Sequence, residues 1–131
     1  MDQHVCPFCD LDKGRIHQEC EVAIAVLDSF PVTEGHTLVI PKRHVKSLFE
    51  LTTTEQTAIW KFVAEVRAML VTQLHPDGFN IGLNDGESAG QTVAHAHVHV
   101  IPRRLGDVTD PRGGVRWLIP DKAAYWTGGN S

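Results

Sequence analysis

The stretch that most constrains the fold is residues 93–102, in which His95, His97 and His99 alternate with apolar residues. Successive side chains of an extended strand point to opposite faces, so the pattern predicts a strand with three imidazoles on one face and an apolar core side on the other. Neighbouring imidazoles would lie about 6.5 to 7 Å apart at their Cα atoms, near enough to meet one small charged group. Two chemistries remain open: a metal site, or acid–base and nucleophilic catalysis near neutral pH.

The loop before this strand, residues 84–92, consists of small, amide, hydroxyl and acidic residues with two glycines. Glycines let backbone N–H groups approach a phosphate closely, and Asn84, Gln91 and Thr92 add hydrogen-bond donors without adding formal charge. Joined directly to three aligned histidines, the loop indicates phosphoryl or nucleotidyl chemistry.

Composition limits the class of protein. A chain of 131 residues forms one domain with a single core, and 42% hydrophobic and 21% charged residues are typical of a soluble globular protein. The formal net charge of -4 argues against a general DNA or RNA binder. No apolar run has the length of a membrane span, and the N-terminal Met-Asp-Gln-His lacks the regions of a signal peptide. We therefore expect a cytoplasmic protein with no nucleic-acid or membrane partner.

The three cysteines fit that compartment, because an odd number without a secretion signal argues against a disulfide framework. Cys6 and Cys9 form a CxxC pair whose thiolates could hold a metal ion. A second CxxC is absent from the sequence, so two further ligands must come from elsewhere. The alternative is two reduced cysteines packed near the N-terminus, and Cys20 is expected to be an ordinary buried thiol.

Local patterns predict the remaining elements. Thr52 and Glu55 form a capping box ahead of an apolar stripe with 3- and 4-residue spacing, which predicts a long helix over about residues 53–74. Strands are expected in three other places: residues 15–27 (two short strands around a turn), 35–42 and 79–84. The last of these would pair with the histidine strand as a hairpin.

Residues 90–102 resemble the signature of the histidine triad (HIT) family, in which three histidines alternate with apolar residues. The resemblance extends upstream through Leu27-Asp28, residues 35–44 and residues 84–86, and so covers a whole domain. It implies an α+β, HIT-like fold: an antiparallel sheet of about five strands with one long and one or two short helices.

The resemblance also implies a domain organisation and an assembly. We expect a single HIT domain over residues 1–131, with a zinc-clip N-terminus in residues 1–14 and a variable C-terminal segment in residues 103–131. Members of the family commonly form homodimers, and a homodimer is expected here.

By position, His97 matches the family nucleophile. Its neutral imidazole would attack the α-phosphate of a nucleotide and form a nucleotidyl-histidine that water hydrolyses, with no catalytic cofactor. The other ring nitrogen must then be held as a donor, which a main-chain carbonyl can do. His99 would contact the phosphate, His36 would help to orient the catalytic imidazole, and His95 would support the triad or ligate zinc.

The resemblance assigns substrate and metal contacts as well. Asp28 matches the residue that holds the ribose hydroxyls, although without the resemblance its position would be taken as that of a turn residue at the end of a strand. Asn84, Gln91 and Thr92 would hold the phosphate and assist the leaving group. Relatives with the N-terminal cysteine pair complete a structural zinc site with two histidines, and the matching ligand set is Cys6, Cys9, His44 and His95.

Substrate choice is indicated by the residues around the triad. Gly-Gln-Thr-Val before it and Pro-Arg-Arg after it are similar to the branch that hydrolyses dinucleoside polyphosphates such as diadenosine tetraphosphate. The alternatives are a purine nucleoside phosphoramidase, a nucleotide-binding protein without catalysis, and a metalloenzyme that uses the triad as ligands. Uridylyl-transferring relatives carry glutamine at the position of His99, which favours hydrolysis here.

Two hypotheses remain open for the role of the C-terminal segment. It begins with Arg103 and Arg104, and Arg112 and Arg116 follow, so that four arginines occur within fourteen residues. They could steer a polyphosphate towards the anion site. Alternatively the segment is a solvated tail whose tryptophans, Trp117 and Trp126, pack onto the body or onto a partner subunit.

Overall fold

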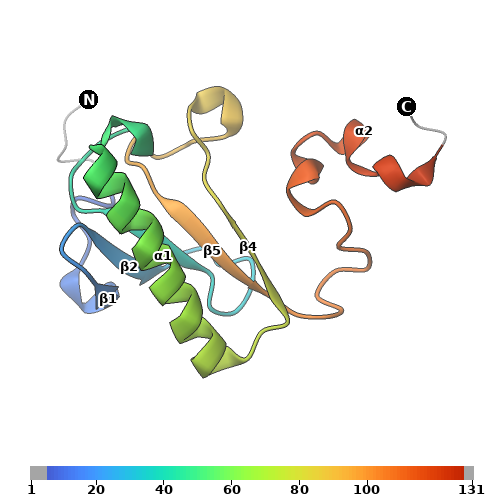
Figure 1. Cartoon of the computed structure of the whole chain (residues 1–131), viewed down its shortest axis with the longest axis horizontal. Coiled ribbons are helices and arrows are strands. Elements are labelled where there is room, and N and C mark those ends of the chain that lie inside the picture. The colour runs from blue at the N-terminus through green and yellow to red at the C-terminus, as the bar shows by residue number, and fades with distance from the viewer. Residues whose placement is uncertain (1–5, 129–131) are drawn as a thin grey trace.

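The computed structural model describes residues 6–128 and has an α+β fold, as predicted (Figure 1). One five-stranded antiparallel sheet has the strand order β1-β2-β3-β5-β4. The strands are β1 (Ile16–Glu19), β2 (Ala23–Leu27), β3 (Thr37–Pro41), β4 (Gly78–Gly82) and β5 (Val98–Arg103). The predicted domain, residues 1–131, reaches beyond this range at both ends, where residues 1–5 and 129–131 lie outside the described residues.

The long helix α1 (Thr53–Leu74) crosses one face of the sheet and has the predicted bounds (Figure 1). The Thr52 side chain accepts from the Glu55 amide while the Glu55 side chain accepts from the Thr52 amide, which is the predicted capping box. His75 ends the helix in the left-handed conformation at φ 49°. The apolar stripe of α1, which includes Ile59 and Phe62, is buried against the sheet. Within residues 6–128 no helix combines the length and hydropathy needed to cross a membrane.

The prediction of a single strand over residues 93–102 is wrong for its first half, because β5 begins only at Val98. Strand pairing stops there: the last pairs join Val39 of β3 to Val98, and Gly82 at the end of β4 to His99, although β3 itself continues to Pro41. Residues 93–97 bond elsewhere, and the Ala96 amide donates to the Val45 carbonyl at 2.8 Å. Because the pairs end at Val98 and His99, the residues before them are not held to strand alternation. His95 bonds to the Pro41 carbonyl and does not join His97 and His99 at the pocket described below.

The C-terminal segment lies beyond the β4 edge of the sheet and includes the short helix α2 (Pro120–Ala123) (Figure 1). It packs largely on itself. The Arg112 guanidinium lies 4.6 Å from the Trp126 ring centre, and the Trp117 indole N–H donates to the Arg112 carbonyl at 2.8 Å. Trp117 also lines a hollow of about 560 Å³ that the segment shares with Asn80 and Ile101 of the body.

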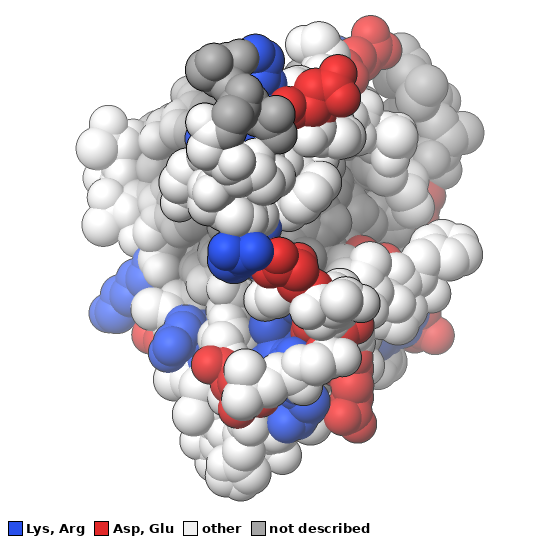
Figure 2. All heavy atoms as spheres, turned by 90° about the vertical axis from the view of Figure 1, so that its right-hand side faces the viewer, with Lys and Arg blue, Asp and Glu red and all other residues white. Residues whose placement is uncertain are grey.

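The four C-terminal arginines are engaged within the chain. Arg103 pairs with Asp107 at 2.7 Å, and Arg104 donates to the carbonyls of Leu74 and His75 at the end of α1. Two more pairs complete the set: Arg112 with Asp110 at 3.0 Å, and Arg116 with the Tyr125 ring at 4.7 Å. Basic and acidic side chains accordingly alternate across this side of the molecule (Figure 2). This arrangement fits a self-contained tail better than a guide for polyphosphate.

Candidate active site and metal cluster

A pocket of about 460 Å³ lies beside the start of β5 and brings together residues that are far apart in the sequence, from Pro7 to His99. Six of the predicted site residues line it: Asp28, His36, Asn84, Thr92, His97 and His99. Gln91 and His95 do not line it and serve other contacts.

His97 is held in one orientation by the main chain. Its Nδ1 lies 2.9 Å from the His95 carbonyl oxygen. Because a carbonyl can only accept, Nδ1 carries a proton, and the tautomer that fits this bond has its lone pair on Nε2. The ring packs edge-on against His99 and Phe8, with centroid distances of 5.1 and 5.0 Å. This is the tautomer that a histidine nucleophile requires.

His36 and His99 form a hydrogen-bonded pair whose protons can be assigned. The Val32 amide donates to His36 Nδ1 at 3.1 Å, so the His36 proton lies on Nε2. His36 Nε2 is 2.9 Å from His99 Nδ1, which must accept, and His99 therefore carries its own proton on Nε2. Asp28 Oδ2 lies 3.4 Å from His36 Nε2. The chain of bonds thus gives His99 a donor for a ligand oxygen.

The electrostatics agree with this assignment. The pKa of His99 is lowered to about 4, mainly because the ring is buried and to a smaller extent because His97 and His36 lie beside it. Burial also lowers the pKa of His36, against the opposing effect of the Asp28 carboxylate. Both rings are therefore neutral near pH 7. A metal ion on Asp28, His36 and His99 is disfavoured, because the Val32 amide occupies Nδ1 of His36 and the proton occupies Nε2.

Gln91 is not placed to hold a phosphate. It is buried, and its side-chain oxygen accepts from the Gly86 amide at 2.8 Å. Its side-chain nitrogen donates to the carbonyls of Lys46 and Val93 at 2.8 and 3.0 Å. Since both ends of the amide are used, Gln91 braces the loop against Lys46 and Val93, and it does not line the pocket that holds the other predicted phosphate contacts.

The loop itself has a fixed backbone. Gly86 and Gly90 have φ values of 103° and 97°, a region that favours glycine. The amides of Ala89, Gly90 and Gln91 donate within the loop at 2.9 to 3.1 Å. These three amides are therefore not offered to a phosphate, and the loop presents the side chains of Asn84 and Thr92 to the pocket.

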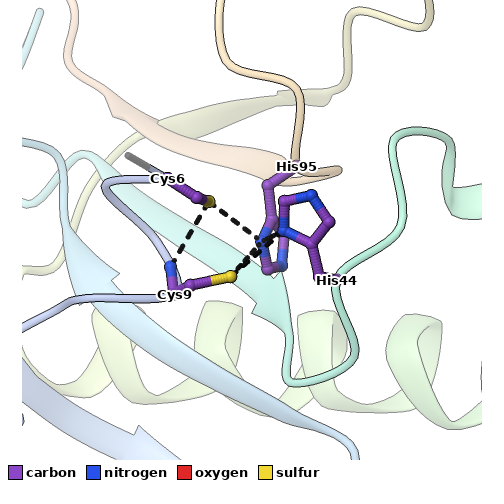
Figure 3. A group of neighbouring side chains, drawn as sticks. All are labelled: Cys6, Cys9, His44 and His95. Carbon is purple, nitrogen blue, oxygen red and sulfur yellow. Dashed lines mark hydrogen bonds between the residues drawn. The ribbon is translucent and has the colours of Figure 1, made fainter. Parts of the chain in front are cut away.

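A second cluster lies behind the pocket, where Cys6, Cys9, His44 and His95 point toward one another (Figure 3). The two Nδ1 atoms are 3.1 Å apart, Cys9 Sγ is 3.1 Å from His44 Nδ1, and Cys6 Sγ is 3.5 Å from His95 Nδ1. His95 Nε2 lies 2.8 Å from the Pro41 carbonyl and so carries the proton, which leaves its Nδ1 lone pair directed into the cluster.

These donors fit a zinc ion. Tetrahedral Zn²⁺ with ordinary Zn–N and Zn–S bonds separates its ligand atoms by about 3.3 to 3.8 Å, close to the separations of this cluster. Desolvation and the neighbouring Cys6 raise the pKa of Cys9 to about 11, so metal binding has to displace that proton. Two thiolates and two imidazoles leave no ligand position for a substrate, which is the character of a structural site.

Most of the other residues that line the pocket were not predicted from the sequence, and two of them contact or charge the site. Phe8 lies between the two cysteines and contacts both His95 and His97, at centroid distances of 5.8 and 5.0 Å. Arg15 adds a cation to the pocket wall, and its guanidinium donates to the Leu27 carbonyl at 2.9 Å. The CxxC spacing pointed to the neighbourhood of Phe8, whereas an arginine before a strand carries no signal of its own.

Comparison with known proteins confirms the predicted family. The family model described as HIT domain matches residues 12–106, and the chain belongs to the HIT family. An uncharacterised HIT-like protein of Mycoplasma genitalium is 41% identical over 102 residues, which are 75% of this chain and 72% of the relative. The asymmetrical bis(5'-nucleosyl)-tetraphosphatase of Schizosaccharomyces pombe is 36% identical over 97 residues, which are 74% of this chain and 53% of that enzyme.

Among solved structures, a Zn-bound histidine triad family protein from Mycobacterium smegmatis is 36% identical, with a TM-score of 0.72. The similarity covers 89% of this chain and 92% of that one.

Proposed function

We propose that the protein is a nucleotide hydrolase that cleaves at the α-phosphate of dinucleoside polyphosphates, through a covalent intermediate on His97. The observation that carries the proposal is the bond between His97 Nδ1 and the His95 carbonyl, because it leaves Nε2 as a nucleophile facing a pocket of nucleotide size. The hydrolase name of the Schizosaccharomyces pombe relative supports the substrate class.

The reaction takes two displacements. His97 Nε2 attacks the α-phosphorus in line, a P–N bond forms, and the P–O bond to the departing polyphosphate breaks. Water then attacks the same phosphorus, the P–N bond breaks, and the nucleoside monophosphate leaves. His99 would donate from Nε2 to a phosphate oxygen through both steps, since His36 holds the other side of its ring.

The other pocket residues would position the substrate. Asp28 Oδ1 already accepts a hydrogen bond from the Phe30 amide at 2.8 Å. Oδ2 is therefore the oxygen that would accept hydrogen bonds from the ribose hydroxyls. Asn84 and Thr92 would hold phosphate oxygens, and the apolar wall that includes Leu11 would cover the base.

The cluster behind the pocket would hold a structural zinc ion through Cys6, Cys9, His44 and His95. Zinc there ties the N-terminal clip to the residues before β5, and the hydrolysis needs no catalytic cofactor. We further propose a single domain with a variable tail from residue 103 onward, a homodimer, and a cytoplasmic location, all as the sequence predicts.

Phosphoramidate hydrolysis is the second candidate. The N–H on His99 Nε2, inferred from the His36 bond, would hydrogen-bond the phosphate of a phosphoramidate in the same way, and the leaving amine would take its proton from solvent. The two activities would share His97 and differ in the leaving group.

Intact-mass spectrometry tests the proposal. The protein is quenched seconds after mixing with diadenosine tetraphosphate or with an AMP phosphoramidate. Wild type and a His17→Ala control, altered in β1 away from the pocket, are expected to gain one AMP group, and His97→Ala is expected to gain none while still binding AMP. The substrate that labels the larger fraction of the protein shows whether polyphosphate or phosphoramidate hydrolysis is the preferred reaction. Absence of labelling and of nucleotide product in wild type, with AMP binding retained, would instead indicate a nucleotide sensor.

A further inference from the structure

Aromatic rings connect the metal cluster to the nucleophile. His44 contacts His95 at a centroid distance of 4.8 Å, Phe8 contacts both His95 and His97, and His97 contacts His99. Phe8 is the member of this row that bridges the cluster and the pocket.

We propose that Phe8 is a positioning residue that transmits the state of the Cys6–Cys9 clip to the orientation of His97; its kinetic consequence rests on the proposed function. Phe8 stands between the two cysteines in sequence, in a turn closed by a bond from the Asp10 amide to the Cys6 carbonyl at 3.2 Å. With both cysteines fixed, the ring between them has little freedom.

Two of the contacts that restrain His97 therefore originate at the metal cluster, and the third is the His99 ring. One is the Phe8 ring, packed edge-on at an interplanar angle of 76°. The other is the His95 carbonyl, supplied by a residue whose own ring lies in the cluster. A clip that opens would move Phe8 away, and the His97 ring could then turn about its Cβ and lose the bond that keeps its proton on Nδ1.

The rival role for Phe8 is a plain pocket wall, since it lines the pocket together with Leu11. Leu11 provides the matched control: it comes from the same N-terminal segment and packs with Phe8 against the same apolar cluster of β2 and β3. A wall residue affects substrate affinity, whereas a positioning residue affects the chemical step and the free enzyme.

The first test is spectroscopic and needs no substrate. Ring nitrogen chemical shifts of ¹⁵N-histidine-labelled protein report the tautomer of His97, with assignment from the signals missing in His97→Ala. Zinc-loaded wild type and Leu11→Ala are expected to show one tautomer, protonated at Nδ1. Phe8→Ala and Phe8→Leu are expected to show a mixture, and Phe8→Tyr to restore the single form. An unchanged tautomer in both Phe8→Ala and Phe8→Leu overturns the proposal.

The second test asks whether the clip acts through Phe8. Cys9→Ser, which should lower bound zinc, is expected to give the same tautomer mixture as Phe8→Ala, while Phe8→Ala keeps wild-type zinc content. In rapid-quench labelling at saturating nucleotide, each change is expected to slow AMP transfer by about 10-fold, and the double variant to be no slower than the worse single one. Any of three results would overturn the proposed role of Phe8: additive losses of AMP-transfer rate in the double variant, a lower zinc content in Phe8→Ala, or an unchanged His97 tautomer in Cys9→Ser. If wild type forms no AMP adduct, the hydrolase proposal fails, while the tautomer comparison still decides the role of Phe8.

Discussion

Acidification should destabilise the protein through His99. The ordinary histidine pKa of 6.5 falls to about 4 at this position, chiefly because of burial. Above pH 6.5 the ring is neutral in both the folded and unfolded chain and contributes nothing to the pH dependence. Between pH 6.5 and 4 the unfolded chain takes up a proton that the folded chain does not, so the free energy of unfolding falls as the pH falls.

The size of the loss follows from the difference in pKa. A difference of about 2.5 corresponds to about 3.4 kcal/mol once the pH is below 4, and to about 2 kcal/mol at pH 5. Because His99 is partly open to the pocket, solvent screening reduces the value at pH 5 to about 1 to 2 kcal/mol.

Urea unfolding at pH 7.5 and pH 5.0 measures this loss against a His99→Asn variant. The Asn side-chain oxygen can replace Nδ1 as the acceptor for His36 but does not titrate. Both proteins keep the metal cluster, so pH effects on zinc binding cancel in the comparison. Wild type is expected to lose about 1 to 2 kcal/mol more than the variant between the two pH values. An equal loss in both proteins would show that His99 is protonated normally in the fold.

Cys9→Ser is expected to lower the zinc content, measured by elemental analysis, and to lower the melting temperature by at least about 5 °C. Cys20→Ser is the control that should change neither, and equal zinc in the two variants would contradict the ligand set. Gln91→Leu should cost about 2 to 3 kcal/mol in urea unfolding because three backbone groups lose their partner, whereas exposed Gln73→Leu should cost almost nothing, and matching curves would remove the bracing role. Asp28→Asn should raise KM for nucleotide about 10-fold with kcat nearly constant, and a fall in kcat alone would count against a ribose contact.

Local signals in the sequence were sufficient for the helix. The capping box of Thr52 and Glu55 and the stop at His75 depend on residues within one or two turns, and α1 has the predicted bounds. The strands at residues 35–42 and 79–84 were also placed correctly, although each is shorter than predicted.

The geometry of the triad could not be predicted in the same way. Alternation along one chain does not show where strand pairing ends, and the pairs with β3 and β4 end at Val98 and His99, so that His95 and His97 lie outside the paired residues. Nor does sequence show that Gln91 would find three backbone partners, one of them 45 residues away at Lys46. The identity of the site residues came from the motif, and their orientation came from contacts between distant segments.

The order of the strands has a consequence for how the active site comes into being during folding. β1, β2 and β3 form hairpins close in sequence, as do β4 and β5. Within the described residues, three strand pairs, from Thr37 with Val100 to Val39 with Val98, join the two groups across some sixty residues of chain. Such a distant pairing forms slowly. Asp28 and His36 lie on one side of this junction and His97 and His99 on the other, so neither half of the chain contains a site by itself. A nucleotide in the pocket, or a metal ion in the cluster behind it, would tie the two halves together and slow hydrogen exchange along the junction between β3 and β5.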